Sequence, residues 1–242
     1  MDAIRIEGLT KEYKDVVAVD HLTLTVGQGE LLSLLGVNGA GKTTTIKMLS
    51  GLTRPTCGDA YLGGHSVVSD STSVKSIIAV SPQETAVALG LSVRENLRLM
   101  CGVHGFVKEK WDEKIAELTE LLGLNSVINK KAGKLSGGWQ RRLSIAMALI
   151  SEPQILFLDE PTLGLDVLAR SDLWDIIRLL KGKVTIILTT HYMEEAEALS
   201  DRVAIMKDGK LLLCDAVDEI KRMAGTDNFE QAFIRVVKGV AQ

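Results

Sequence analysis

A glycine-rich stretch ending in a lysine and a threonine carries the residues best suited to chemistry. Residues 36–43 read Gly-Val-Asn-Gly-Ala-Gly-Lys-Thr, which fits the phosphate-binding pattern G-x-x-x-x-G-K-[ST]. Glycines allow successive backbone N–H groups to converge on phosphate oxygens. Lys42 is therefore expected to reach the β- and γ-phosphates of a nucleotide, and the Thr43 hydroxyl is expected to ligate Mg²⁺.

The neighbouring segments place this stretch between a strand and a helix. Residues 31–35 form an apolar run with the length of a buried strand, and residues 44–49 form a plausible helix that stops at Gly51. The N-terminus of such a helix adds partial positive charge where a phosphate would lie. An ordinary glycine-rich turn is the alternative, and the strand–loop–helix context disfavours it.

Two carboxylates follow a second apolar run. Residues 155–158 read Ile-Leu-Phe-Leu, which predicts a central parallel strand, and Asp159 and Glu160 come directly after it. Ligands of open α/β sheets bind at the carboxyl ends of the strands. Asp159 is therefore expected to hold Mg²⁺, and Glu160 to polarise a water near the γ-phosphate. A solvated acidic turn is the alternative.

Four further signals are weaker when each is taken alone. Residues 136–138, Ser-Gly-Gly, precede an expected helix over 140–150 and form a second candidate anion site. His191 ends a buried strand-type run, which is a better place for a ligand than most histidines have. Tyr13 could stack on a base, although packing is the commoner role of an aromatic residue. Gln83 could be a solvated loop residue or a mobile amide that senses a metal or water.

Composition indicates an ordinary globular protein with reduced cysteines. The 242 residues are 46% hydrophobic and 24% charged, and the net charge of −3 gives no support for nucleic-acid binding. Cys57, Cys101 and Cys214 are scattered, which disfavours a disulfide framework and a zinc site. The charged first seven residues are unlike a signal peptide, and no apolar run reaches the roughly 20 residues that span a bilayer.

The rest of the chain alternates between strand and helix patterns. Helical periodicity runs from about residue 91 to 148, with Ser92 and Glu95 forming a capping box. Residues 69–73 are expected to be a polar loop, and Asp208-Gly209 is expected to be a hairpin turn. Residues 215–223 suit a helix, and Phe229, Phe233 and Val236 have the spacing of a short terminal helix.

Taken in order, these motifs resemble those of the nucleotide-binding subunits of ATP-binding cassette (ABC) transporters. The resemblance covers nearly the whole chain. It implies an α/β fold: a P-loop NTPase (RecA-like) core with a mostly parallel sheet, an N-terminal antiparallel β subdomain and an inserted α-helical subdomain. We expect one domain over 1–242, with 1–83 and 154–222 as the core, 84–153 as the helical subdomain, and 223–242 as a short C-terminal extension.

The resemblance also assigns roles to residues. It implies that Glu160, His191 and Lys42 act in catalysis, and that Thr43, Gln83 and Asp159 hold the metal. Residues 135–139 match the family's signature motif, and Leu165-Asp166 closes its D-loop. The implied nucleotide contacts are Tyr13, Gly36, Val37, Asn38, Gly39, Ala40, Gly41, Lys42, Thr43, Thr44, Gln83, Ser136, Gly137, Gly138 and Asp166.

Partners follow from the same resemblance. The motifs are similar to those of the group that serves ABC-2-type exporters, which implies ATP and Mg²⁺ as cofactors and a separate transmembrane permease as partner. A second ATP-binding subunit, in a homodimer, would complete the site at the cytoplasmic face of the membrane. Two positions depart from the pattern: Trp139 replaces a glutamine of the signature motif, and Val167 replaces a frequent proline. A soluble ABC ATPase acting on DNA or ribosomes is the alternative.

Overall fold

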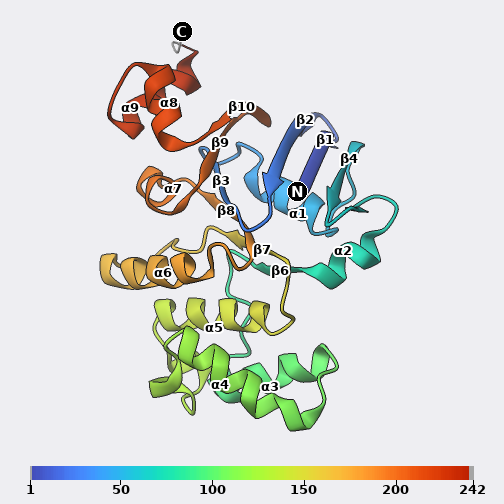
Figure 1. Ribbon diagram of the computed structural model, residues 1–242, viewed down its shortest axis with the longest axis vertical. Coiled ribbons are helices and arrows are strands. Elements are labelled where there is room, and N and C mark those ends of the chain that lie inside the picture. The colour runs from blue at the N-terminus through green and yellow to red at the C-terminus, as the bar shows by residue number, and fades with distance from the viewer. Residues whose placement is uncertain (1, 240–242) are drawn as a thin grey trace.

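An antiparallel sheet forms the N-terminal part of the structure. The computed structural model describes residues 2–239. Two long strands, β1 (Asp2–Tyr13) and β2 (Val16–Gly27), make a hairpin, and β4 (Cys57–Leu62) and β5 (His65–Ser66) extend it in the order β2-β1-β4-β5. Buried and exposed residues alternate along β1 and β2, so that one face of the sheet packs on the core. This sheet lies on the right in Figure 1.

The second sheet is mostly parallel and holds the centre of the molecule. Its strand order is β10-β9-β3-β8-β7-β6, and each neighbouring pair is parallel except the β9–β10 hairpin. All residues of β3, β7 and β8 are buried, as continuous apolar runs in parallel strands predict. The strands are β3 (Leu31–Leu35), β6 (Ile78–Ser81), β7 (Ile155–Asp159), β8 (Thr185–Thr190), β9 (Arg202–Lys207) and β10 (Lys210–Asp215).

Helices cover the central sheet. The helix after the glycine-rich loop is α1 (Lys42–Leu49), and α6 (Val167–Leu180) and α7 (Met193–Leu199) follow β7 and β8. The expected polar loop over 69–73 is wrong, because α2 (Ser71–Ile77) begins there. The side chain of Asp70 accepts a hydrogen bond from the Ser73 N–H, so this polar run is a helix N-cap rather than a loop.

The helical segment comprises α3 (Val93–Val103), α4 (Trp111–Leu121) and α5 (Gly137–Leu149). The capping box of Ser92 and Glu95 is confirmed. The helix expected over 140–150 begins earlier, so both glycines of the Ser-Gly-Gly run lie in its first turn, and Ser136 is at the N-cap. Short 3-10 turns at Lys108–Lys110, Asn125–Val127 and Ala132–Lys134 connect the helices.

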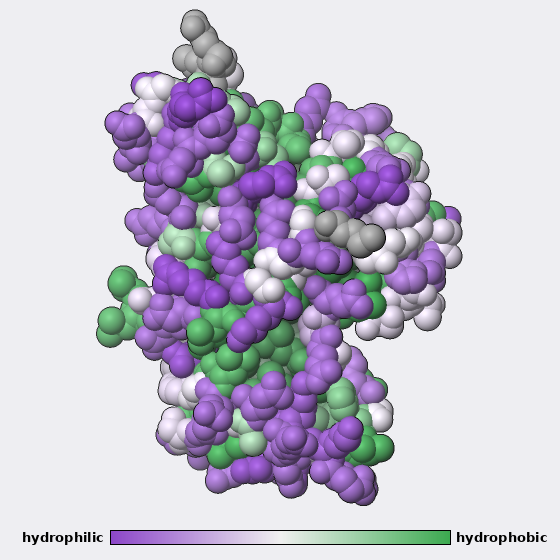
Figure 2. All heavy atoms as spheres, in the orientation of Figure 1, coloured by the Kyte–Doolittle hydropathy of each residue, from purple (hydrophilic) through white to green (hydrophobic). Residues whose placement is uncertain are grey.

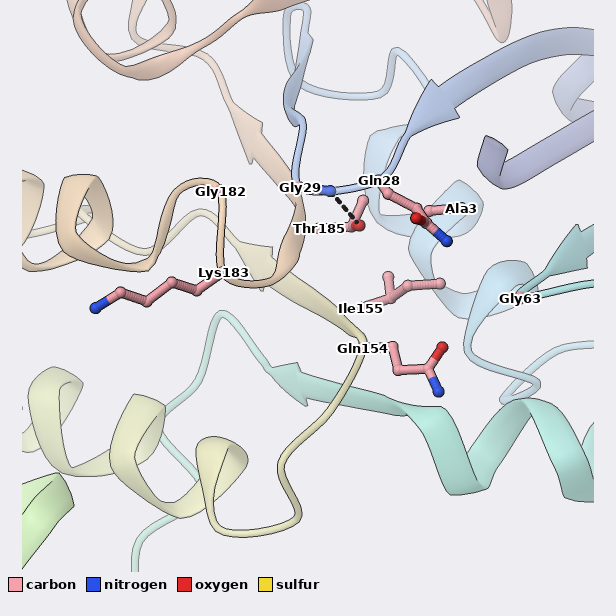
Figure 3. A pocket seen from close by; sticks show the side chains of 9 residues that line it. All are labelled: Ala3, Gln28, Gly29, Gly63, Gln154, Ile155, Gly182, Lys183 and Thr185. Atoms are coloured by element: carbon pink, nitrogen blue, oxygen red, sulfur yellow. Dashed lines mark hydrogen bonds between the residues drawn. The ribbon is translucent and has the colours of Figure 1, made fainter. Parts of the chain in front are cut away.

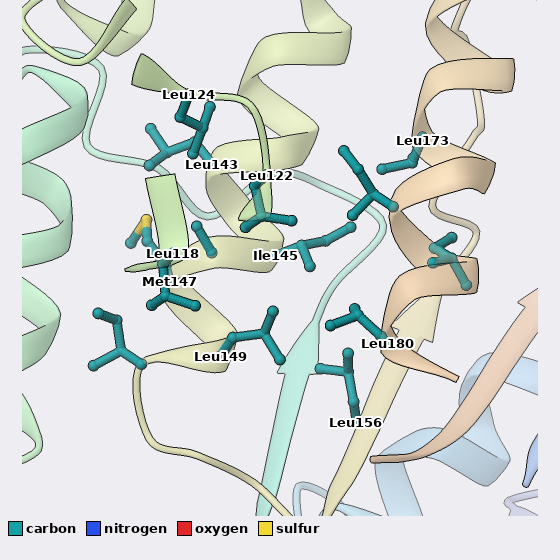
Figure 4. Packing of buried hydrophobic residues seen from close by; sticks show 14 of the residues in the cluster. Leu118, Leu122, Leu124, Leu143, Ile145, Met147, Leu149, Leu156, Leu173 and Leu180 are labelled. Atoms are coloured by element: carbon teal, nitrogen blue, oxygen red, sulfur yellow. The ribbon is translucent and has the colours of Figure 1, made fainter. Parts of the chain in front are cut away.

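One hydrophobic cluster joins the helical segment to the central sheet. Figure 4 shows side chains of α4 and α5 packed with side chains of β7 and α6. Leu122, Leu143 and Ile145 of the helical segment belong to the same cluster as Leu156 of β7 and Leu173 of α6. Helix α5 is therefore buried on several sides, between the rest of the helical segment and the central sheet with α6.

Two amphipathic helices end the described chain. Helix α8 (Val217–Ala224) and helix α9 (Phe229–Lys238) pack on β9, β10 and α7, at the top left of Figure 1. The expected terminal helix is confirmed, with Phe229 and Phe233 buried. The extension expected over 223–242 includes residues 240–242, which lie outside the described residues. Within residues 2–239, no helix has the length and apolar composition that crossing a bilayer requires.

Candidate functional site

A cavity of about 530 Å³ opens at the carboxyl ends of β3, β7 and β8. Its volume lies within the range of about 300–1,000 Å³ that small-molecule sites occupy. The parallel register aligns the ends of these strands, so that segments far apart in the sequence meet there. The residues lining it are Tyr13, Ala18, Asn38, Gly39, Ala40, Gly41, Lys42, Thr43, Thr44, Gln83, Glu160, Leu163 and His191.

The glycine-rich loop requires glycine at particular positions. A Cβ on Gly36 would lie 2.4 Å from the Met206 carbonyl oxygen, so a side chain there would clash with the backbone. Gly41, immediately before α1, has φ +101°, and a Cβ there would lie 2.5 Å from the Ala18 carbonyl oxygen. The loop can therefore curl tightly around the start of α1, where the backbone N–H groups favour an anion.

Lys42 is almost completely buried at the floor of this loop, with 5% of its surface exposed. Its Nζ donates to the carbonyl oxygens of Gly36 (2.7 Å) and Val37 (3.2 Å) and lies 3.7 Å from Glu160 Oε1. Burial lowers the pKa of Lys42, and the nearby carboxylates of Glu160 and Asp159 oppose that change. The ammonium group is thus held beside the loop by backbone oxygens and by the catalytic carboxylate expected from the sequence.

Asp159 ends β7 with its side chain among hydroxyl groups. Its Oδ1 accepts from Thr43 Oγ1 at 3.2 Å and from Thr189 Oγ1 of the neighbouring strand β8. The structure therefore brings two of the three side chains expected to hold a metal, Thr43 and Asp159, into direct contact. Sequence reasoning missed Thr189. It lies near the end of the buried strand β8, where it pairs with Asp159 of β7 and comes two positions before His191.

Glu160 has a strained backbone conformation. Its φ of +46° is in the left-handed region, which non-glycine residues rarely adopt. Two interactions hold it there, because its N–H donates to the Thr189 carbonyl oxygen (3.1 Å) and to Thr189 Oγ1 (3.0 Å). The carboxylate then lies between Lys42 Nζ at 3.7 Å and His191 Nδ1 at 3.3 Å, both facing the cavity.

Gln83 reaches the cavity through a segment that a buried arginine fixes. Arg141 of α5 donates to the carbonyl oxygens of Pro82 (2.6 Å) and Gln83 (2.5 Å). Burial lowers the pKa of the Arg141 guanidinium, although Asp159 and Glu195 oppose the change. Sequence reasoning missed Arg141; the available signal was a charged residue on the same helical face as Ser144 and Ile145.

The expected residues of the signature motif and the D-loop lie on another surface. Ser136, Gly138 and Asp166 line a separate hollow of about 280 Å³ between the N-termini of α5 and α6. Among residues 2–239, its lining shares no residue with that of the cavity at the glycine-rich loop. Trp139 also lines it, with the Arg142 guanidinium 4.9 Å from the centre of its ring. One chain therefore places the two halves of the expected site on different surfaces.

Another cavity, of about 330 Å³, lies at the opposite edge of the central sheet, beside the start of β7 and β8. In Figure 3 its polar side chains are Gln28, Gln154 and Thr185, and the Lys183 side chain points away from the others. The Thr185 hydroxyl accepts from the Gly29 N–H at 3.0 Å. No charged side chain converges on this cavity within the described chain, so it lacks the chemistry of a phosphate site.

Comparison with known proteins identifies the family. The profile of the family described as "ABC transporter" matches residues 19–163, more than half of the chain. The daunorubicin/doxorubicin resistance ATP-binding protein DrrA of Streptomyces peucetius is 41% identical over 226 residues, which are 93% of this chain and 68% of that protein. The phospholipid-transporting ATPase ABCA3 of Homo sapiens is 39% identical over 226 residues, which are 92% of this chain.

The chain spans unequal shares of these relatives: 68% of the Streptomyces protein and 13% of the human one. A solved dimeric structure of an ATP-binding cassette, in a post-hydrolysis state bound to ADP and Pi, is similar with a TM-score of 0.78 and 25% identity. The similarity covers 88% of this chain and 98% of that one. Motifs, strand order and cavity agree with these findings, and the chain belongs to the ABC transporter family as one of its ATP-binding ATPases.

Proposed function

We propose that this chain is the ATP-hydrolysing subunit that powers export through a separate membrane permease. The observation that carries the proposal is the division of one expected site between two surfaces. The phosphate loop, Glu160 and His191 share one cavity, while Ser136 and Gly138 lie at another. Each surface offers half of what is needed to enclose a nucleoside triphosphate.

In the nucleotide cavity, each residue has a physical role. The backbone from Gly36 to Thr44 would cradle the phosphates, and Lys42 would neutralise charge on the β- and γ-phosphates. Tyr13, half-exposed at the rim, would stack its ring on the adenine. Glu160, held between two potential cations, would accept a hydrogen bond from the attacking water. His191 would stabilise charge that develops on the γ-phosphate.

Mg²⁺ fits the oxygens at the end of β7. Thr43 and Asp159 are in contact at 3.2 Å, and the Gln83 side chain lies at the same cavity. No group of three or more His, Cys, Asp or Glu residues suited to a metal occurs in the described part of the chain. A site with so few protein ligands suits Mg²⁺, which keeps waters and takes oxygens from phosphates. When bound, the ion would neutralise charge on the phosphates.

We propose that a second copy of the chain completes the site. In a head-to-tail dimer, the helix start at Ser136 and Gly138 of one copy would face the phosphate loop of the other, with Asp166 beside it. Two apolar side chains near this helix start face solvent: Val167 and Leu168, at the start of α6, are each 78% exposed. Figure 2 shows hydrophobic side chains projecting at the left beside α6. Burying them would favour the dimer.

The proposed direction of transport and the proposed cellular location are supported by family membership and by the names of the relatives. The Streptomyces relative is named as a drug-resistance ATP-binding protein, and a solved structure with 23% identity is described as part of the ABC transporter complex cbiONQ. We therefore propose a permease partner and a position at the cytoplasmic face of the membrane. A net charge of −3 gives no electrostatic attraction to DNA or ribosomes, the targets of the alternative class.

Mixing two inactive variants tests the proposal. Lys42→Ala removes the phosphate-loop cation, and Ser136→Arg blocks the opposite surface without touching the first cavity. In a mixed head-to-tail dimer, one of the two composite sites is intact. An equal mixture should therefore recover about a quarter of the wild-type ATPase rate if the sites act independently.

The matched control is an equal mixture of the single variants Lys42→Ala and Thr43→Ala. Both lesions lie on the phosphate-loop surface, so no dimer in that mixture has an intact site. The proposal fails if the first mixture recovers no more activity than this control. It also fails if Ser136→Arg alone hydrolyses ATP at the wild-type rate.

A further inference from the structure

Thr189 carries a buried hydroxyl group that contacts both acidic residues of the proposed site. It is the fifth residue of β8, has 0% of its surface exposed, and pairs with Asp159 across the sheet. Within residues 2–239, the lining of the cavity at the glycine-rich loop does not include it. The hydroxyl group is therefore shielded from a bound nucleotide, and any role in the reaction must act through its neighbours.

The hydroxyl group of Thr189 both accepts and donates a hydrogen bond. Its oxygen accepts the Glu160 N–H at 3.0 Å, and its proton is donated to Asp159 Oδ1. The result is a chain that runs from the Glu160 amide through the hydroxyl group to the Asp159 carboxylate. Hydrogen bonds in such a chain polarise one another, and each is electrostatically stronger in a buried site than in water.

The backbone of Glu160 needs this support. Its φ of +46° costs free energy for a residue with a side chain, and such a conformation persists only where the surroundings fix it. The Thr189 carbonyl oxygen accepts the same N–H at 3.1 Å, so one residue supplies both acceptors. Relaxation of this φ would turn the carboxylate away from Lys42 Nζ at 3.7 Å and from His191 Nδ1 at 3.3 Å.

The Asp159 carboxylate depends on the same hydroxyl group. Its Oδ1 accepts from Thr43 and from Thr189. Thr43 is the residue expected to turn its oxygen toward Mg²⁺, whereas Thr189 is held in the neighbouring strand by the register of the sheet. Thr189 is thus the fixed partner that orients the Asp159 carboxylate, as hydrogen bonds from outside a metal site do for its ligands.

We propose that Thr189 is a positioning residue, whose hydroxyl group fixes the metal-holding carboxylate of Asp159 and the catalytic carboxylate of Glu160 relative to each other. By accepting from one residue and donating to the other, it ties the end of β7 to β8. Threonine and serine can do both, and valine can do neither. The proposal rests on the proposed ATP hydrolysis, because the positioned side chains are its catalytic and metal-holding groups.

Two substitutions of Thr189 separate the hydroxyl group from the shape of the side chain. Thr189→Val keeps the shape and removes the hydroxyl group. Its kcat at saturating ATP and Mg²⁺ should fall about tenfold or more, since small misplacements of catalytic groups act on the chemical step. Its KM for ATP should stay within about threefold of wild type, because the glycine-rich loop is unchanged. Thr189→Ser restores the hydroxyl group and should keep kcat within about threefold of wild type.

Thr185, at the other end of the same strand, provides a matched control. It is also buried, and its hydroxyl group also accepts a backbone N–H, that of Gly29 at 3.0 Å, as Figure 3 shows. Thr185→Val therefore makes the same chemical change in β8, far from the carboxylates, and should leave kcat within about twofold of wild type. Rates are divided by the number of ATP-binding sites measured in each preparation, so that loss of folded protein is not counted as loss of kcat.

Crystal structures of the nucleotide-free variants provide a measurement that does not depend on turnover. In Thr189→Val, the Glu160 carboxylate should no longer lie between Lys42 and His191, whereas Thr189→Ser and Thr185→Val should keep both contacts. A Thr189→Val variant that is slow although Glu160 keeps its φ and both contacts would overturn the inference.

The kinetic outcomes are equally distinct. A wild-type kcat in Thr189→Val, or a Thr189→Ser variant as slow as Thr189→Val, would remove the positioning role. An equal loss of kcat in Thr185→Val would also overturn it, because weakening of β8 would then explain the effect. If Thr189→Val does not fold, Thr189→Ser is compared with Thr189→Ala, which likewise lacks the hydroxyl group. Absence of ATPase activity in wild type would instead refute the proposed function.

Discussion

Replacing Arg141 with methionine tests how the Gln83 segment is held beside α5. The Arg141 side chain is buried, and its two terminal nitrogens donate to the carbonyl oxygens of Pro82 and Gln83 at 2.6 and 2.5 Å. Methionine fills a similar volume but donates no hydrogen bond. The substitution therefore leaves two carbonyl groups at the edge of the nucleotide cavity without their donors.

The magnitude follows from these contacts. A hydrogen bond involving a charged group contributes about 1.5–3 kcal/mol. Part of that loss is recovered, because the guanidinium no longer has to be desolvated. We expect Arg141→Met to lower the free energy of unfolding by about 3 kcal/mol, which corresponds to about 6–12 °C in Tm for a chain of this length.

Arg142→Met is the matched control, since it makes the same change at the next residue of the same helix. Arg142 pairs with Asp172 at 2.6 Å, but the Asp172 side chain is 63% exposed, and such a pair contributes about 0–1 kcal/mol. Thermal unfolding followed by circular dichroism, without nucleotide, measures both variants. Tm values within about 2 °C of each other would refute the reasoning that Arg141 holds this segment.

Three further outcomes are expected. Lys42→Ala should bind ATP at least about tenfold more weakly by calorimetry, because the buried cation beside the phosphate loop is lost; unchanged affinity would contradict the loop assignment. Glu160→Gln should bind ATP, hydrolyse it very slowly and accumulate as a dimer in size-exclusion chromatography with ATP and Mg²⁺, whereas a strictly monomeric variant would count against the composite site. Ser92→Ala removes a cap far from the cavity and should lower the unfolding free energy by about 1 kcal/mol with unchanged kcat, so a large loss of kcat would be unexpected.

The strands and the phosphate loop could be predicted because their signals are local. Every residue of 31–35 and 155–159 is buried, as their apolar runs predict, and the glycine pattern fixes the loop between β3 and α1. The start of α2 was missed because the same polar residues that favour loops also cap helices. Whether this polar run forms a loop or caps a helix depends on the hydrogen bond from the Ser73 N–H to Asp70. Residue composition alone does not predict that contact.

The contacts that position the site could not be predicted because they join residues far apart in the sequence. Arg141 meets Pro82 and Gln83 across 59 and 58 positions, and Thr189 meets Asp159 across 30. Neither pair has a local pattern, since a buried arginine in a helix and a threonine in a strand are individually ordinary. Only the strand order β8-β7-β6, with α5 packed on it, brings their polar atoms together.

Helix α5 links the two halves of the proposed site within one chain. Its first turn contains Gly138, whose backbone packs closely on the start of α6, because a Cβ there would lie 3.0 Å from that of Ala169. One turn further on, Arg141 holds the carbonyl group of Gln83. Since the hydrophobic cluster packs α5 against both the sheet and α6, a displacement of Gln83 would strain the contact that carries Gly138. We therefore expect a ligand that shifts Gln83 in one cavity to act, through Arg141, on the surface that this chain would present to the nucleotide of a second copy in the proposed dimer.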